Sequence, residues 1–351
     1  MSSLPPVLDN ESEPELVEPR RPWPAGRVRV HAPARLHLGF LDPAGTRGRP
    51  FGSLGLVFDG PETVVEIGRA DTDRFDTFAG GASAMAKARG HLETLRRATG
   101  CQDPVRLRLR SALPSHVGLG SGTQLALAVG HAFCATFDLP HDSVQLAALL
   151  GRGARSGVGV AGFDHGGLLL DGGPRADGSP AAIVARVALP VTWRAILVLD
   201  PRVQGLFGPE EKAALAALPP LPRAAAAEIC HEVLMRVMPG AAGAEFSPFA
   251  QGLSRMQNVL GEHFAPVQHG RSFTSAPAER LLKWIANYTE AGIGQSSWGP
   301  AGFAFLPSQA DADAVLAAAD AAGMIDPVLE ISTVRPRNHG ATVCDLRGAG
   351  G

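Results

Sequence analysis

A glycine-rich stretch at residues 113–124, LPSHVGLGSGTQ, constrains the fold of this chain more than any other segment. It joins a segment that alternates apolar and basic residues, 105–110, to an apolar, helix-prone segment, 125–137. Alternation is typical of a half-buried strand, so the stretch predicts a strand-to-helix turn. Its glycines can adopt positive φ and let consecutive N–H groups converge on an anion at the helix's positive end. The residues therefore predict a phosphate-binding turn; a turn that only lets the helix pack on a sheet is the alternative.

Size and charge exclude several classes of protein. A chain of 351 residues, 45% hydrophobic and 19% charged, is long enough for one large or two packed domains. A net charge of −2 argues against nucleic-acid binding. No apolar run approaches the roughly 18 residues that span a bilayer, and the four cysteines lack the spacing of a zinc site. We expect a cytoplasmic protein with small-molecule partners, no nucleic acid and no membrane association.

The order of predicted elements gives the fold class. Residues 1–26 are acidic and Pro-rich and predict a disordered tail, followed by domains at 27–178 and 179–347. Strands and helices in both halves predict an α+β protein. Predicted strands cover residues 28–40, 55–58, 63–67, 105–109, 183–187, 194–199, 302–305, 328–333 and 342–346. Predicted helices cover residues 82–98, 124–137, 143–152, 209–218, 223–237, 249–263, 278–291 and 310–322. A glycine-rich segment, 151–173, predicts a loop that approaches a ligand, and residues 292–300 predict another glycine turn.

Three glycine-bearing segments follow one another along the chain: APARLHLGF, LPSHVGLGSGTQ and GIGQSSWGPAGFAF. Their order and spacing resemble the GHMP kinase superfamily. The resemblance implies a two-domain fold, with an N-terminal domain like ribosomal protein S5 domain 2 and a ferredoxin-like C-terminal α/β sandwich. Gly122 stands where those kinases have a second Ser, a departure that argues against ATP phosphotransfer.

The variant motif GLGSGTQLAL, with RSGVGVAGFDHGG, DGG and GQSSWGP, resembles the β-ribofuranosylaminobenzene 5'-phosphate synthase family. The resemblance implies transfer of ribose 5-phosphate from phosphoribosyl pyrophosphate (PRPP) to a ring carbon of 4-aminobenzoate. Pyrophosphate and carbon dioxide leave in that reaction. The resemblance also implies Mg²⁺ and a homodimer.

Backbone N–H groups and cationic side chains suit the phosphates of PRPP. The turn is expected to hold the pyrophosphate, while Arg35, Arg152 or Arg155 clasps the 5-phosphate; surface or packing arginines are the alternative. The candidate PRPP-binding residues are Arg35, His116, Gly118, Leu119, Gly120, Ser121, Gly122, Thr123, Arg152 and Arg155.

The aromatic substrate needs a flat wall and polar groups for its carboxylate. Gln295, Ser296, Ser297 and Trp298 are the candidates, although a Trp before a strand is often a core anchor.

Asp164 and His165, within the 151–173 segment, are candidates for Mg²⁺ binding and proton transfer respectively; a turn-stabilising Asp beside a surface His is the alternative. His37 is two residues from Arg35 on a predicted strand and completes the predicted catalytic set.

Three functions remain open on these residues: a PRPP-dependent decarboxylating transferase, an ATP-dependent GHMP small-molecule kinase, and a catalytically silent ligand-binding relative. The sequence leaves 4-aminobenzoate and 4-hydroxybenzoate undecided as the acceptor.

Overall fold

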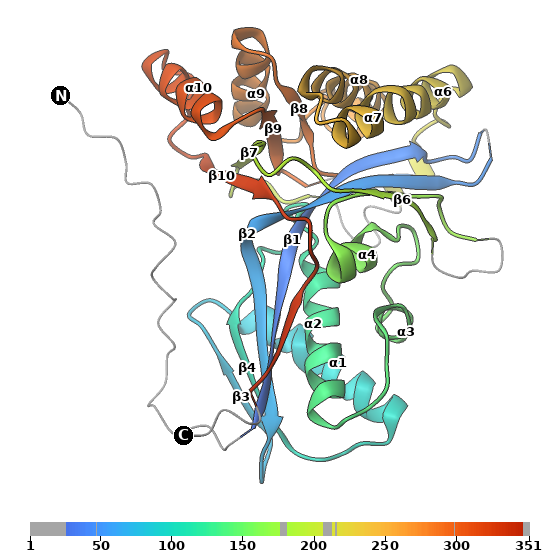
Figure 1. The fold of residues 1–351 in the computed structure, drawn as a ribbon, viewed down its shortest axis with the longest axis vertical. Coiled ribbons are helices and arrows are strands. Elements are labelled where there is room, and N and C mark those ends of the chain that lie inside the picture. The colour runs from blue at the N-terminus through green and yellow to red at the C-terminus, as the bar shows by residue number, and fades with distance from the viewer. Residues whose placement is uncertain are drawn as a thin grey trace.

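A computed structural model describes residues 26–46, 48–175, 181–205, 213–214, 216–297 and 299–346. The predicted tail, apart from Gly26, and half of the predicted helix 209–218 lie outside these residues. Figure 1 shows an upper layer of helices above one group of strands, and a lower layer in which helices cover one side of a long, twisted sheet. The structure confirms the α+β class.

The lower layer is built from the first half of the chain. Its strands are β1 (Arg27–Asp42), β2 (Phe51–Arg69), β3 (Arg74–Thr77), β4 (Val105–Ser111), β5 (Leu168–Asp171) and β6 (Ile183–Val187). Its helices are α1 (Ala82–Thr99), α2 (Ser121–Thr136), α3 (Ser143–Leu149) and α4 (Val158–His165). One face of the sheet packs on α1 and α2, because alternate residues of β1 and β4, such as Val28 and Leu107, are buried against them.

The upper layer comes mostly from the second half. Its helical segments are α6 (Arg223–Glu232), the π-helical η1 (Val233–Val237), α7 (Met238–Ala242), α8 (Phe246–Phe264), the 3₁₀ turn η2 (Ala265–Val267), α9 (Ala276–Tyr288) and α10 (Gln309–Ala321). Its strands are β7 (Arg194–Leu199), β8 (Gly292–Gln295), β9 (Gly302–Leu306) and β10 (Glu330–Pro336), and the last strand is β11 (Thr342–Asp345). Alternate residues of β7 and β9 face α9 and α10 on one side, and α6, α8 and parts of β1 and β2 on the other.

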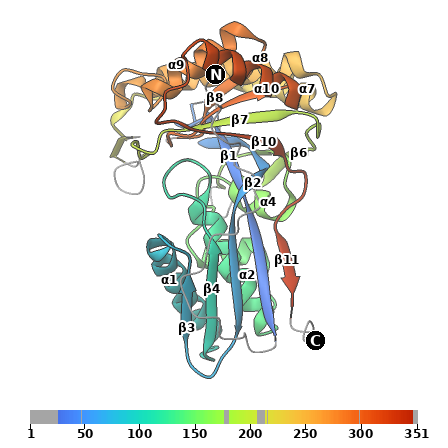
Figure 2. The same cartoon turned by 90° about the vertical axis from the view of Figure 1, so that its left-hand side faces the viewer.

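The described strands form one sheet, with the path β11-β1-β2-β10-β7-β9-β8. Figure 2 shows β11 beside β1 at the lower end, although β10 lies in the upper layer. Both β6 and β11 pair with strands of the first half. The boundary between residues 178 and 179 therefore stays a prediction, since strands on its C-terminal side complete the N-terminal layer.

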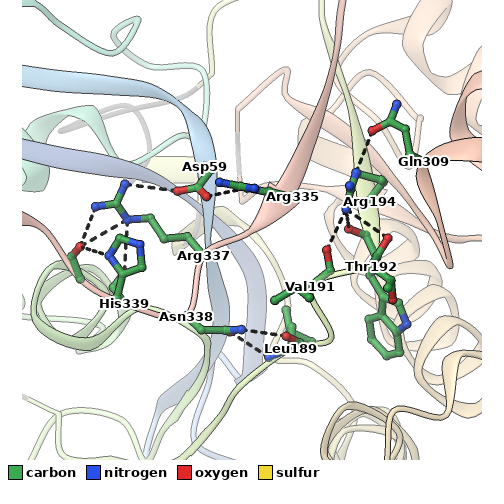
Figure 3. A network of polar contacts seen from close by, with 12 residues as sticks. Asp59, Leu189, Val191, Thr192, Arg194, Gln309, Arg335, Arg337, Asn338 and His339 are labelled. Carbon is green, nitrogen blue, oxygen red and sulfur yellow. Dashed lines mark hydrogen bonds and ion pairs between the residues drawn. The ribbon is translucent and has the colours of Figure 1, made fainter.

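Arg337 anchors the crossing from β10 to β11. Its guanidinium binds Asp59 at 3.2 Å and the carbonyl oxygen of Gly340 at 2.8 Å, while Asn338 pairs with the backbone of Leu189 (Figure 3). The same segment reaches α4, because the Ala341 N–H donates to the carbonyl of Phe163. These contacts tie the end of the chain to both layers.

Three sequence predictions of local structure were wrong. The 151–173 segment is not a continuous loop but contains α4 and β5, and the predicted turn at 292–300 begins with β8. The two strands predicted at 55–58 and 63–67 are parts of the single strand β2. Glycine and proline weaken a strand or helix prediction, but packing on both faces overrides them here: Gly159 and Gly162 lie inside α4, where their missing side chains allow close approach of Thr123 and Val57. In the described ranges no helix is both long and apolar enough to cross a membrane.

Candidate active site

The GLGSG turn leads directly into α2, as predicted. Gly118 and Gly120 have φ of +94° and +83°, the left-handed region that favours glycine. A Cβ at Gly118 would lie 2.5 Å from the carbonyl oxygen of Ser296, so close approach also requires glycine there. Gly122 differs, because it lies within the helix without positive φ, and a Cβ there would lie 3.1 Å from Nη1 of Arg152.

Bulges in β1 join the turn to the first predicted motif. The pairing of β1 with β2 shifts register between Pro33 and Arg35 and again between His37 and Gly39. Bulges interrupt the regular ladder, so backbone groups there can bind elsewhere. The Arg35 N–H donates to the carbonyl of Leu119 (3.1 Å) and the His37 N–H to the Ser296 hydroxyl (2.9 Å).

The third predicted segment closes the same site. The Ser296 hydroxyl donates to the Gly118 carbonyl at 2.6 Å, and the Ser297 N–H donates to the His37 carbonyl at 2.9 Å. The Ala301 N–H donates to the Val117 carbonyl at 3.1 Å. The structure thus brings the three glycine-bearing segments together.

Two of the predicted arginines flank the start of α2. Arg35 packs on Gly120, where a Cβ would lie 2.9 Å from its Cγ, and Arg152 packs on Gly122. They contact different parts of this junction, because Gly120 is the N-cap with left-handed φ and Gly122 lies inside the helix. Neither forms an ion pair with a described carboxylate, and the Nε atoms of both are buried without a hydrogen-bond partner. Burial lowers the pKa of Arg35 to about 10 and also lowers that of Arg152.

These arginines add positive charge to a helix terminus that is already electropositive. No side chain caps the N-terminus of α2, and its first turn contains no acidic residue. First-turn N–H groups lack intrahelical acceptors and carry part of the helix dipole's positive charge. The half-buried Ser121 and Thr123 add hydroxyls at the same place. The arrangement therefore suits a multiply charged anion.

The other two basic candidates lie beside this region. His116 is part of the turn, with φ of +65°; burial, and then the charge of Lys87, lowers the pKa of its imidazole. Arg155 is half-buried in the connection between α3 and α4.

Asp171, which sequence analysis did not single out, organises that connection. Its carboxylate accepts hydrogen bonds from the N–H groups of Ser53, Gly157 and Gly173 and from the Ser156 hydroxyl, at 2.9–3.0 Å. Burial raises the pKa of Asp171, and these four donors oppose the shift. An Asp followed by two glycines, in a segment with other glycines, was the available signal.

Two basic residues of α1 were also missed. Lys87 donates a hydrogen bond of 3.1 Å to the Ser115 hydroxyl of the turn. His91 lies one helical turn further on, and its Nε2 is buried without a partner in the described structure. A Lys and a His at positions i and i+4 of a predicted helix share one face, which was the signal in the sequence.

The predicted aromatic-substrate residues have different surroundings. Gln295 uses its side-chain oxygen for Thr274 and its amide nitrogen for Gln268 and the Ser297 carbonyl. Ser296 is fully buried and binds the framework as described above. Ser297 lines a pocket with apolar walls from Leu260, Phe264 and Phe273. Trp298 lies outside the described residues. The assignment of these four residues to the aromatic substrate stays a prediction.

His37 is beside the turn but enclosed. Its ring is 5% exposed and packs on Phe40, with centroids 4.9 Å apart. Burial, followed by the nearby charge of Arg35, lowers the pKa of the imidazole to about 3. This environment favours a neutral ring at neutral pH.

Asp164 and His165 are exposed at the C-terminal end of α4, whereas Gly159, near the other end, faces Thr123 of α2. Asp164 accepts a short hydrogen bond from Ser143, and the His165 carbonyl accepts one from Arg186 at 2.8 Å. No contact in the described ranges joins either residue to the GLGSG turn, so the structure does not bring them together with the PRPP-binding candidates.

The side chains do not form a preassembled magnesium site. The described residues contain no group of three or more His, Cys, Asp or Glu side chains placed to hold a metal. The Asp164 carboxylate accepts a hydrogen bond from Ser143. The Asp171 carboxylate already accepts four hydrogen bonds from protein donors. No step of the reaction is therefore assigned to a metal that protein side chains hold.

Comparison with known proteins identifies the family. The models of the GHMP kinases N terminal domain and the GHMP kinases C terminal domain match residues 86–167 and 244–324. The β-ribofuranosylphenol 5'-phosphate synthase of Archaeoglobus fulgidus is 32% identical over 295 residues, 81% of this chain and 89% of that protein. The chain belongs to the β-ribofuranosylphenol 5'-phosphate synthase family. The synthase of this family from Methanothermobacter thermautotrophicus is 29% identical over 78% of this chain and 86% of its own.

A solved structure outside the synthase family shares the fold. The phosphomevalonate kinase of Streptococcus pneumoniae superimposes with a TM-score of 0.64 at 13% identity, covering 88% of this chain and 99% of the kinase. Identity this low shows the fold alone. Together with the two family models, it confirms the predicted GHMP kinase-like fold for this member of the synthase family.

Proposed function

We propose that this enzyme is a β-ribofuranosylaminobenzene 5'-phosphate synthase. It condenses PRPP with 4-aminobenzoate to form the C-riboside 4-(β-D-ribofuranosyl)aminobenzene 5'-phosphate, and releases pyrophosphate and carbon dioxide. The observation that carries the proposal is the pair Arg35 and Arg152, which flank the uncapped start of α2 with no described carboxylate partner. Relatives at 29–32% identity named as synthases of a ribofuranosyl 5'-phosphate support it.

The first chemical step is the departure of pyrophosphate, which takes place at the anion site. The bond between the anomeric carbon and pyrophosphate breaks, and negative charge develops on the departing oxygens. N–H groups at the start of α2 and the Arg35 guanidinium stabilise that charge, because they are fixed before the reaction and partly shielded from water. Any Mg²⁺ in the reaction would bind pyrophosphate oxygens, since the described side chains supply no cage for it.

The second step is the attack of the aromatic ring on the anomeric carbon. Its carboxyl-bearing carbon, para to the amino group, donates an electron pair to the anomeric carbon and forms the new carbon–carbon bond. The bond to the carboxylate then breaks, its electrons return to the ring, and carbon dioxide leaves. No external oxidant or reductant is needed. We propose that the ring approaches from the side of Ser297, which lines a pocket with Leu260, Phe264 and Phe273 and donates its N–H to the His37 carbonyl.

The names of the relatives specify a phenol, whereas we propose an aniline product. A hydroxyl and an amino group both donate electrons to the para carbon, so the chemistry permits either acceptor. The choice depends on a hydrogen-bonding contact at that group, because a site with a fixed polar partner discriminates strongly between donor and acceptor groups.

Release of labelled carbon dioxide tests the proposal. Carboxyl-labelled 4-aminobenzoate and 4-hydroxybenzoate are supplied separately, each with and without PRPP. We expect PRPP-dependent release, faster with 4-aminobenzoate. Faster release with 4-hydroxybenzoate would replace the acceptor and keep the reaction class. ATP consumption without release would indicate a kinase, and substrate binding with neither reaction would indicate a silent relative.

Arg35→Met tests the anion site within that assay. The variant removes a half-buried charge that has no described carboxylate partner and whose Nε is buried without a hydrogen bond, so the free energy of unfolding should stay the same or rise. The KM for PRPP should rise by about 10-fold or more, since a charge-assisted contact is lost. Arg255→Met, which removes an exposed ion pair to Glu228, is the control and should leave the KM unchanged.

A further inference from the structure

PRPP carries two anionic groups, a pyrophosphate and a phosphate monoester, at different carbons of one ribose. An enzyme that positions this sugar needs two neighbouring anion sites. The start of α2 can serve one of them. Each of the two anion sites then needs its own basic residues near the turn.

Arg152 contacts the start of α2 at a different residue from Arg35. Its Nη1 is 3.1 Å from the point where a Gly122 Cβ would stand, whereas Arg35 packs on Gly120. Lys87 lines the same hollow as Gly122, on which Arg152 packs, and His91 shares a face of α1 with Lys87. The three basic groups therefore lie in one neighbourhood.

A hollow connects this neighbourhood to the start of α2. Lys87, Ser115, Ser121 and Gly122 provide its polar lining. The Lys87 ammonium is held at its edge by the 3.1 Å hydrogen bond to Ser115. Thr63 and four apolar residues complete the lining: Ala84, Ala112, Leu113 and Leu125. A ligand phosphate here would contact the ammonium, two hydroxyls and the first turn of α2.

The neighbourhood holds cationic groups but no described anion to balance them. No carboxylate in the described ranges forms an ion pair with Lys87 or Arg152, and the buried Nε2 of His91 and Nε of Arg152 lack hydrogen-bond partners. Like charges close together repel, and buried polar atoms without partners cost free energy. A bound phosphate monoester would relieve both costs. Its negative charge would also oppose the lowering of the His91 pKa to about 4, which burial causes together with the charges of Arg152 and Lys87.

We propose that Lys87, His91 and Arg152 form a second subsite that binds the 5-phosphate monoester of the sugar donor, while Arg35 and the turn hold its pyrophosphate. This inference rests on the proposed function. It adds the α1 face of Lys87 and His91 to the site and separates the roles of two arginines.

Equilibrium binding to the full-length protein tests the subsite, with ribose 5-phosphate and inorganic pyrophosphate as separate probes. Lys87→Gln changes an exposed residue, so the fold should be retained. It should weaken ribose 5-phosphate binding by about 10-fold and leave pyrophosphate binding within about 2-fold. His91→Gln should act in the same direction. Lys283→Gln, which removes an exposed lysine of α9 paired with Glu279, is the matched control and should change neither affinity.

The outcomes separate this inference from the proposed function. Equal or greater weakening of pyrophosphate binding would overturn the assignment of the subsite to the monoester. Unchanged binding of both probes to both variants would show that α1 contributes no subsite. If the parent protein bound neither probe nor PRPP, the proposed function itself would fail.

Discussion

The Ser296 hydroxyl donates a hydrogen bond of 2.6 Å to the carbonyl oxygen of Gly118, 178 positions earlier in the chain. The Ser296 hydroxyl oxygen also accepts from the His37 N–H at 2.9 Å, so one buried hydroxyl connects the three glycine-bearing segments. Its geometry fixes the turn relative to the bulged part of β1. The shape of the anion site therefore depends on a residue from the far end of the chain.

Ser296→Ala should lower the free energy of unfolding by about 1–3 kcal/mol, because the buried His37 N–H loses its acceptor and the Gly118 carbonyl keeps only the 3.5 Å contact from Arg35. The KM for PRPP should also rise, since the turn is no longer held. Urea unfolding and steady-state kinetics measure the two effects. Ser308→Ala removes the N-cap of α10, far from the turn, and should cost about 1 kcal/mol with an unchanged KM. Equal KM values in the two variants would contradict the role of Ser296.

Gly118 and Gly122 should respond differently to substitution. Gly118→Ala places a Cβ 2.5 Å from a backbone oxygen at φ of +94°, so we expect a loss of about 2 kcal/mol in unfolding free energy. Gly122→Val displaces only the end of the Arg152 side chain and should abolish turnover in a folded protein. Circular dichroism and carbon dioxide release distinguish the two cases.

Gly90→Ala is the control for both substitutions. Gly90 lies in α1 with no atom within 4 Å of its added Cβ, so the change should raise stability by about 0.5–1 kcal/mol and preserve activity. Parental kinetics in Gly122→Val would argue strongly against the assignment of PRPP to the start of α2 and Arg152.

His37 makes stability depend on pH. Its pKa of about 3 in the folded protein is below the ordinary value of about 6.5, so the unfolded chain binds the proton more readily between these values. The stabilising contribution is complete above about pH 6.5 and is lost as the pH falls towards 3. Between pH 8 and pH 5 the loss should be about 2 kcal/mol. Urea unfolding of the parent and His37→Gln proteins should show a shallower pH dependence in the variant, and superimposable profiles would refute this explanation.

Asp164→Asn tests the predicted metal ligand. The residue is exposed and bound to Ser143, away from the turn, so we expect catalytic activity within about 2-fold of the parent and an unchanged dependence on Mg²⁺ concentration. Titration of Mg²⁺ in the carbon dioxide assay measures this. A higher Mg²⁺ requirement in the variant would restore Asp164 as a ligand.

A homodimer remains a proposal from the sequence resemblance. Sedimentation of the purified protein over a range of concentrations would test it, with a single monomeric species as the contrary result.

Much of the local structure was predictable. The alternation at 105–110 and the glycines after it predicted β4, the turn and α2, because strand periodicity and positive φ are properties of neighbouring residues. The 151–173 segment was misread, since glycines that allow close packing of α4 look the same in sequence as glycines of a loop.

The sequence by itself determined the three glycine-bearing motifs, the residue types that can bind phosphate, and the family resemblance. Tertiary structure alone decided that Arg35 and Arg152 pack on two glycines at the start of α2, that Lys87 and Gly122 line one hollow, and that Asp164 and His165 lie at the far end of α4. The physical reason is the separation along the sequence of the residues that decide each property. Backbone conformation is set largely by adjacent residues, whereas the meeting of side chains many positions apart depends on how bulges, helices and strands pack together.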